Sequence, residues 1–340
     1  MKVLLIGAGA IGGTVAVCCK KAGYDIRLMC HRTETKDLIE KEGFFLHGAK
    51  GELHETFTCY DSYAALGDER FDLVIIATKY QAMYDAARNI LPYLTDDGLV
   101  VGMQNGMLTE SLAEIVGKDR AVGVMLGFGA TRNGANDVTM TSLGEIVIGM
   151  LSGKTPNMLG KLKTMLTSVL PTTISDDIKS VQYSKLVINS CINACAAITG
   201  CVLGDMANNS RTKKVFLEIA REGLRVAKGL GISVPTYGKV LNYKLFMLAD
   251  NPAFNAAARG IVTIVMKSKY ASVKPSTLQS LEKGEKTEID AFNGYFVEKG
   301  KECGVPTPVN EKLVRMIHEI EDGTRPISLD NLREFEGMLY

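Results

Sequence analysis

The sequence predicts an α/β protein in two parts, and three observations lead to this expectation. The chain opens on an apolar strand that runs into a glycine-rich turn, and further apolar strand patterns recur to about residue 150. Beyond residue 177 the spacing of apolar residues is helical. At 340 residues the chain is also long for one compact domain. We therefore expect an α/β domain over residues 1–176 and an all-helical domain over residues 177–340.

The opening turn follows a continuous apolar strand that ends at Ile6. Its residues are Gly7, Ala8, Gly9, Ala10, Ile11 and Gly12. Strand, glycine turn and helix start in this order are typical of the Rossmann-type dinucleotide-binding domain. Gly7 allows the turn, Gly9 lets the backbone approach a pyrophosphate, and Gly12 lets the helix pack on the strand. A flexible turn in another α/β protein is the alternative interpretation.

The end of the second predicted strand, residues 25–30, bears on the choice of cofactor. NAD-binding proteins commonly place Asp or Glu there to hold the ribose hydroxyls, whereas this chain continues with His31, Arg32 and Thr33. Arg32 can pair with a 2′-phosphate, so the sequence favours NADP (NADPH) over NAD. A solvated loop arginine is the alternative.

Two further strand patterns in the first half end in polar residues. Residues 71–79 end in Thr78-Lys79, and residues 98–103 are followed by Gln104-Asn105-Gly106. Because the carboxyl ends of buried parallel strands face the ligand crevice, we expect Lys79 and Asn105 to lie there. A surface lysine and an ordinary Asn-Gly turn are the alternatives. The sequence also predicts a hairpin over residues 43–59 and strands over residues 121–126 and 145–149.

The second half carries helical spacing with breaks at glycine and proline. Helices are predicted over residues 178–200, 209–230, 236–249, 252–267 and 286–303. In the first of these, Lys185, Asn189 and Asn193 are spaced i, i+4 and i+8, so they share one stripe of an otherwise apolar helix. Buried polar groups need partners, so they either satisfy one another and the backbone or line a polar cavity.

A second polar cluster, residues 286–294, opens the last of these predicted helices. Thr287 is suited to cap its first turn. Glu288 and Asp290 complement the positive end of a helix, and this capping role is the structural alternative to any catalytic one.

Composition restricts the class of protein. The 39 Lys and Arg residues nearly balance the 38 Asp and Glu residues, so no strong field attracts nucleic acid or an anionic membrane. The 8 cysteines form no CxxC pair and the 4 histidines show no ligand spacing, so neither a metal site nor a disulfide framework is indicated. No run reaches the roughly 18 apolar residues of a membrane span.

These residues favour a cytoplasmic protein with reduced thiols and a small-molecule partner. The opening apolar run is interrupted by glycines and followed by Lys20 and Lys21, which argues against a signal peptide. The sequence does not distinguish a monomer from a homodimer.

Taken together, the chain resembles the ketopantoate reductase family (2-dehydropantoate 2-reductases) over nearly its whole length. The landmarks that carry the resemblance, in order, are residues 7–12, Thr78-Lys79, Asn105-Gly106, the helix from Lys185 to Asn193, Ser276, residues 287–290 with Asn293-Gly294, and residues 304–310. The family implies an N-terminal Rossmann domain for NADPH, a helical C-terminal domain and an active site in the cleft between them.

The resemblance also implies roles for individual residues. Lys185 is then the general acid that protonates the carbonyl oxygen of the substrate, and Glu288 binds a substrate hydroxyl and helps to fix Lys185. Asn189 and Asn193 orient the polar groups of the substrate, and Ser276 contacts its carboxylate. Lys79 and Asn105 line the side of the cofactor, and Asn105 also adjoins the substrate. The implied reaction is the reduction of ketopantoate to pantoate, a step of pantothenate and coenzyme A biosynthesis.

The chain departs from the family pattern at two places. Leu203 stands where the pantoate-forming enzymes tend to carry another asparagine. The segment 238–274 is longer than in compact members and adds basic residues, namely Arg259, Lys267, Lys269 and Lys274. These departures bear on the substrate, so another 2-oxo acid is the first alternative. A 3-hydroxyacid or opine-type dehydrogenase, and a non-catalytic NADPH-sensing protein, are the others.

Overall fold

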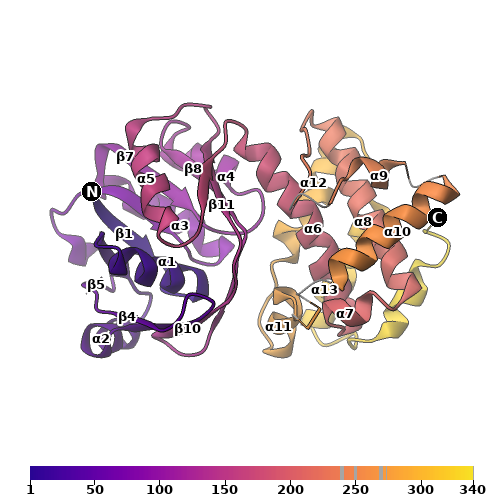
Figure 1. Cartoon of the computed structure of the whole chain (residues 1–340), viewed down its shortest axis with the longest axis horizontal. Coiled ribbons are helices and arrows are strands. Elements are labelled where there is room, and N and C mark those ends of the chain that lie inside the picture. Colours follow the sequence, from indigo (N-terminus) through magenta and orange to yellow (C-terminus); the bar gives the residue numbers. More distant parts are fainter. Residues whose placement is uncertain (238–240, 249–250, 268–270, 273, 340) are drawn as a thin grey trace. The chain divides into compact units, whose positions relative to one another are not determined.

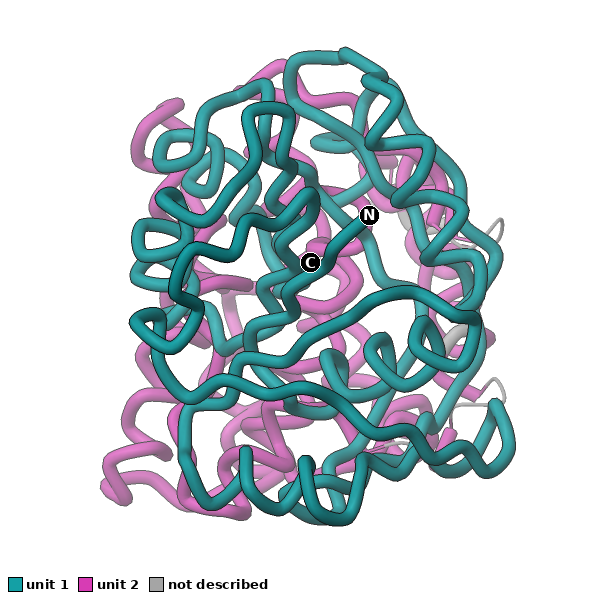
Figure 2. Tube along the Cα trace, turned by 90° about the vertical axis from the view of Figure 1, so that its left-hand side faces the viewer, with its two compact units in different colours: residues 1–182 teal, residues 183–340 magenta. Residues whose placement is uncertain are grey.

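The computed structural model describes residues 1–237, 241–248, 251–267, 271–272 and 274–339. The chain forms two compact units, residues 1–182 and residues 183–340 (Figure 2). Their boundary falls inside the helix α6 (Ile178–Thr199), whereas the sequence places it just before this helix begins. The difference arises because the start of α6 packs on the first unit, where Gln182 accepts a hydrogen bond from Thr109 (2.9 Å).

The first unit is built on a sheet of eight strands (Figure 1). In spatial order the strands are β12 (Thr172–Ile174), β11 (Ile146–Met150), β8 (Ala121–Leu126), β7 (Leu94–Gly102), β6 (Phe71–Ile76), β1 (Lys2–Ile6), β2 (Asp25–Met29) and β5 (Cys59–Tyr60). All neighbours are parallel except β8 and β11, which pair antiparallel. The strands predicted from their apolar runs are present.

Helices cover both faces of this sheet, which explains why its central strands are apolar without alternation. In β1, Val3 and Leu5 pack in one hydrophobic cluster, while Leu4 and Ile6 pack in another on the opposite face. The first cluster includes residues of α1 (Ala10–Lys21) and α5 (Asn157–Thr167), and the second includes residues of α3 (Tyr80–Ile90) and α4 (Thr109–Val116). The predicted α/β fold is confirmed as a doubly wound sheet.

A smaller sheet covers the outer side of α1. The predicted hairpin is present as β3 (Phe44–Gly48) and β4 (Leu53–Glu55), and it is extended by β10 (Asp137–Ser142) and β9 (Gly129–Arg132) in the order β4-β3-β10-β9. The short helix α2 (Thr33–Glu42), which the sequence analysis did not predict, leads into this sheet. The buried ring of Phe44 packs directly on the backbone of Gly13 in α1.

The second unit is helical. Besides α6 it contains α7 (Leu203–Met206), α8 (Ser210–Gly229), α9 (Lys244–Met247), α10 (Pro252–Met266), α11 (Ser276–Glu282), α12 (Asn293–Cys303) and α13 (Pro308–Glu321), with 3₁₀ turns η3 (Ile289–Ala291) and η4 (Leu329–Phe335). Helix α8 lies at the centre of the unit and contacts α10, α12 and α13. No helix in the described part of the chain is both long enough and apolar enough to cross a membrane.

Two helix predictions in this unit are wrong in extent. Of the predicted helix 236–249, the described residues form only the single turn of α9, and Tyr237 makes an isolated bridge to Leu241. Residues 238–240 and 249 lie outside the described residues. The helix predicted over 286–303 begins only at Asn293. Thr287 does not cap it, because its backbone and hydroxyl groups bond to the side chain of Glu321 instead.

The contact between Gly13 and Phe44 gives a test of this packing. A Cβ at residue 13 would lie 2.4 Å from Cζ of Phe44, and that ring is fully buried. We expect Gly13→Ala to lower the free energy of unfolding by about 1–3 kcal/mol through overpacking. Gly160→Ala in α5 is the matched control, because a Cβ there meets no atom within 4 Å and should stabilise its helix by about 0.5–1 kcal/mol. Thermal unfolding measures both, and equal melting temperatures for the two variants would contradict the packing.

Candidate functional site

The carboxyl ends of four neighbouring strands form one row in the first unit. Strand pairing sets Ile6 of β1 opposite both Met29 of β2 and Ile76 of β6, and sets Ile76 opposite Gly102 of β7. The polar segments that follow these strands therefore emerge at the same edge of the sheet. Chain order reverses here, since β1 leads to β2 on one side and β6 lies on the other, and such switch points bind ligands in α/β sheets.

The glycine turn has the geometry that the sequence predicts for it. Gly7 has φ +103°, which disfavours any side chain. A Cβ on Gly12 would lie 2.0 Å from the carbonyl oxygen of Gly7, so this position must stay bare for α1 to pack. A Cβ on Gly9, in contrast, would meet no protein atom within 4 Å. The turn thus leaves open space beside Gly9, the residue that precedes the first turn of α1.

This open space suits the pyrophosphate of a dinucleotide. No side chain caps the N-terminus of α1, and the N–H groups of a first helical turn have no acceptor within their own helix. They attract an anion together with the helix dipole. Nearby, Thr78 Oγ1 and Gln104 Oε1 are buried without a hydrogen-bond partner in the described structure, and such atoms call for a ligand or water.

Gln104 ties together two of the strand ends that carry predicted site residues. Its amide nitrogen donates to the carbonyl oxygens of Ile76 (3.0 Å) and Thr78 (3.1 Å). This bridge fixes the backbone just before Lys79, which is exposed at the start of α3, relative to Asn105, which is partly buried. The sequence analysis did not single out Gln104. The sequence feature that could have identified Gln104 is a polar residue placed directly after an apolar strand.

Arg32 lies at the same edge, three residues beyond the end of β2. It precedes α2, and its carbonyl oxygen accepts from the backbone N–H groups of Thr35 and Lys36 (3.1 Å each), while its side chain is exposed. Lys36, one turn further on, is engaged with Asp37 (3.2 Å) and Glu40 (3.0 Å). The two cations therefore differ, because Lys36 already has carboxylate partners on its own helix.

In the second unit, Lys185, Asn189 and Asn193 all lie on α6, as predicted. Burial lowers the pKa of the Lys185 ammonium to about 8, and the negative charge of Glu288 acts in the opposite direction. In the structure desolvation outweighs the carboxylate at Lys185. An ammonium of this kind holds its proton at neutral pH and releases it readily.

Asn193 has partners within the chain at both ends of its side chain. Its amide nitrogen donates to the carbonyl oxygen of Asn189 (3.0 Å), and its amide oxygen accepts from Ser276 Oγ (3.1 Å) and from the backbone N–H of Thr277 (3.2 Å). Asn193 is buried, whereas Ser276, the first residue of α11, is exposed. Asn193 thus holds Ser276 in place. Of the two alternatives for the polar stripe, internal satisfaction applies to Asn193.

The residues at which the chain departs from the family pattern lie on or beside different helices. Leu203 is buried in α7, Arg259 is partly buried in α10, and Lys267 is exposed. Lys274 is exposed and pairs with Glu282 (2.7 Å), while Lys269 lies outside the described residues. Lys274 therefore has a structural partner on α11.

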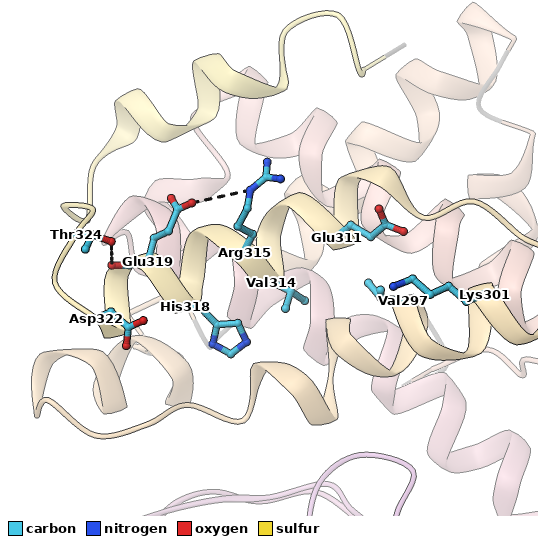
Figure 3. Close-up of a pocket in the computed structure, with 9 residues that line it drawn as sticks. All are labelled: Val297, Lys301, Glu311, Val314, Arg315, His318, Glu319, Asp322 and Thr324. Carbon is cyan, nitrogen blue, oxygen red and sulfur yellow. Dashed lines mark hydrogen bonds and ion pairs between the residues drawn. The ribbon is translucent and has the colours of Figure 1, made fainter.

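A surface hollow of about 510 Å³ lies on the second unit between α12 and α13 (Figure 3). Its lining includes cations and carboxylates, among them Lys301, Glu311 and Arg315, as well as Val297 and Val314. None of the predicted site residues lines it. The hollow is therefore separate from the candidate site.

Comparison with known proteins shows what the two units resemble. The family model described as ketopantoate reductase PanE/ApbA matches residues 3–153, and the model of the C-terminal part of the same family matches residues 177–321. A 2-dehydropantoate 2-reductase of Aquifex aeolicus is 28% identical over 329 residues, which cover 93% of this chain and 96% of that protein.

Solved structures share the fold. A PanE/ApbA family ketopantoate reductase from Ralstonia eutropha JMP134 is 24% identical, with a TM-score of 0.79 over 95% of this chain and 99% of that one. D-mandelate dehydrogenase, solved with NADH and anilino(oxo)acetate, is 22% identical, with a TM-score of 0.80 and the same coverage. These solved structures therefore share the fold along nearly the whole chain.

The hydrogen bonds of Asn193 separate it from its neighbour on the same stripe. We expect Asn193→Ala to lower the free energy of unfolding by about 1–3 kcal/mol, because Ser276 and the Thr277 N–H lose their acceptor. Asn189→Ala removes a partly exposed side chain from the same helix face and should change stability by less than about 0.5 kcal/mol. Urea unfolding measures both. Equal losses would show that Asn193 does not anchor α11.

Proposed function

Because this chain belongs to the ketopantoate reductase family, we propose that it catalyses the NADPH-dependent reduction of 2-dehydropantoate (ketopantoate) to pantoate. The observation that carries the proposal is the buried ammonium of Lys185, on which the negative charge of Glu288 acts. A lysine whose pKa lies at about 8, in the field of a carboxylate, is suited to donate a proton near neutral pH.

The chemistry assigns one step to Lys185. Bound NADPH supplies a hydride to the ketone carbon of the substrate. As that bond forms, the C=O π electrons move onto the oxygen, which becomes an alkoxide. Lys185 stabilises this charge as an ammonium and then transfers one proton to the oxygen, which yields the hydroxyl of the product and a neutral amine. Proton uptake from solvent restores the ammonium.

The remaining polar residues of α6 and α11 are proposed to orient the substrate. The partly exposed amide of Asn189 is suited to its polar groups, and the exposed hydroxyl of Ser276 is suited to its carboxylate. Asn193 acts on the substrate through Ser276, because its amide oxygen accepts a hydrogen bond from the Ser276 hydroxyl, as well as through its own position on the stripe. Glu288 is proposed to bind a substrate hydroxyl as well as to act on Lys185.

The cofactor is proposed to lie on the row of strand ends in the first unit. Residues 7–12 would hold its pyrophosphate, and Lys79 and Asn105 would line the nearby edge. Arg32 would pair with the 2′-phosphate that distinguishes NADPH from NADH. All eight thiols are free of disulfides, which agrees with the proposed cytoplasmic location.

The proposed function is tested by NADPH oxidation with ketopantoate beside a panel of other 2-oxo acids. Lys185→Ala should lower kcat by about 10²–10⁴-fold, because the alkoxide loses its proton donor. In the wild type kcat/KM should decline as pH rises through about 8, since only the protonated lysine is active.

Lys179→Ala, six residues earlier on α6 and paired with Glu110 (2.7 Å), is the matched control for Lys185→Ala. A near-normal rate for Lys185→Ala would remove the proposed acid, and tight NADPH binding without oxidation of any panel member would favour a sensor.

The proposed choice of cofactor is tested separately at Arg32. Arg32→Ala should weaken NADPH binding by about 10–100-fold, the loss expected for a charge-assisted hydrogen bond, and should leave NADH binding unchanged. Lys36→Ala should affect neither cofactor, because Lys36 is engaged by Asp37 and Glu40. Fluorescence titration of each variant with both cofactors measures this, and an equal loss for NADPH and NADH would rule out a 2′-phosphate contact.

A further inference from the structure

Glu321, the last residue of α13, carries a buried carboxylate that none of the roles above uses. Its side chain is 3% exposed. One carboxylate oxygen, Oε1, accepts two hydrogen bonds from Thr287, from its backbone N–H (2.8 Å) and from its hydroxyl (2.6 Å). Thr287 directly precedes Glu288, so the buried carboxylate holds the chain next to the residue whose charge acts on Lys185.

The second oxygen of Glu321 meets positive charge. His318 Nδ1 lies 3.1 Å from Oε2, and Lys286 Nζ lies 3.3 Å from it. Each of these groups has a further acidic neighbour, because His318 Nε2 lies 3.0 Å from Asp290 and Lys286 lies 3.1 Å from Asp322. Burial raises the pKa of the Glu321 carboxyl, but the bonds from Thr287, His318 and Lys286 outweigh it and lower the pKa below its ordinary value. Glu321 is therefore charged at neutral pH.

The segment held by Glu321 is a turn with little regular structure of its own. The hydroxyl of Thr287 also accepts from the backbone N–H of Ile289 (3.3 Å), and the backbone carbonyl oxygen of Glu288 accepts from the N–H of Ala291 (3.0 Å). Glu288 itself has φ −100° and ψ 24°, outside both helix and strand geometry. Both residues next to Glu288, Thr287 and Ile289, are therefore held by hydrogen bonds, which restricts the backbone conformation at Glu288.

Helix α13 gives this arrangement a firm base. At its N-terminus, the backbone N–H groups of Val309 and Asn310 each donate to the buried carboxylate of Glu222 on α8 (2.9 Å). Asn310 also accepts from Asn293 at the start of α12 (2.8 Å). The helix that presents Glu321 is therefore fixed at its opposite end to the centre of the unit.

From these contacts we propose that Glu321 is a positioning residue for the reaction, which holds Thr287 so that the carboxylate of Glu288 keeps its place near Lys185. The inference rests on the proposed function, because it concerns the same lysine. Its consequence is specific. When Glu288 is displaced, the charge that favours the protonated lysine weakens, while the desolvation that disfavours it remains.

Three variants separate positioning from a merely structural role. Glu321→Ala removes the carboxylate oxygen that accepts both hydrogen bonds from Thr287. Glu321→Gln keeps an amide oxygen that can accept the same two bonds. Asp322→Ala is the matched control, since Asp322 is the next residue, is exposed and shares the partner Lys286, whereas the donors of Thr287 bond to Glu321. For each variant, kcat/KM with NADPH and ketopantoate is measured from pH 6 to 10, beside thermal unfolding and NADPH binding.

We expect Glu321→Ala to lower kcat by about tenfold and to move the basic limb of the pH profile to lower pH by about one unit, because the pKa of Lys185 falls. Glu321→Gln should restore most of kcat and most of the position of the basic limb, and Asp322→Ala should match the wild type. NADPH binding should be unchanged in all three. If Glu321→Ala does not fold, Glu321→Gln and Thr287→Val test the positioning role in its place. Thr287→Val should also move the basic limb of the pH profile to lower pH, because it loses the hydrogen bond from the hydroxyl to Glu321.

A double variant tests whether Glu321 acts through Glu288. Glu288→Gln alone should shift the limb downward, and adding Glu321→Ala should shift it no further, because coupled residues are not additive. An additive shift, or a fall in kcat with an unmoved limb, would overturn the positioning role. A parallel measurement on Lys185→Ala distinguishes a failure of the proposed function from a failure of the positioning role of Glu321. If that variant is inactive and the wild-type limb is present, an unmoved limb in Glu321→Ala refutes the role of Glu321 alone.

Discussion

The parallel pairing of β1 with β2 and β6 is the constraint on which the first unit depends. Together with the parallel pairing of β6 with β7, it sets four strand ends in one row, and every segment that we propose to contact the cofactor begins at that row. The close contact at Gly12 adds to this, because α1 can start beside the row only when residue 12 has no side chain. The position of the open space beside Gly9 follows from these two facts.

The second unit depends on a different constraint, which is the high free energy of unpaired polar groups inside a helical core. Three buried or partly buried carboxylates meet it in three ways. Glu222 binds the start of α13, Glu321 binds the turn before η3, and Glu288 acts on Lys185. Side chains that satisfy buried groups in this way also fix the segments that bear the proposed substrate contacts.

Sequence reasoning succeeded where a local pattern is tied to one geometry. The apolar strands, the hairpin and the stripe on α6 are in place because burial on a sheet or helix requires a fixed period. It failed where a distant residue decides the local structure. Thr287 follows the local rules for a helix cap, yet its donors go to Glu321, 34 residues away, and the helix starts later. Gln104 and Glu321 were missed because their importance depends on partners that no local pattern identifies.

The amino-acid sequence by itself determined the class of fold, the glycine turn and the set of polar residues on α6, because backbone conformation and side-chain period depend on neighbouring residues. Only the tertiary structure decided how these residues are held and charged. Asn193 is an anchor for Ser276 rather than a free amide, and desolvation outweighs the carboxylate at Lys185. Hydrogen-bond partners and burial are set by segments that are far apart in the chain, so neither follows from spacing alone.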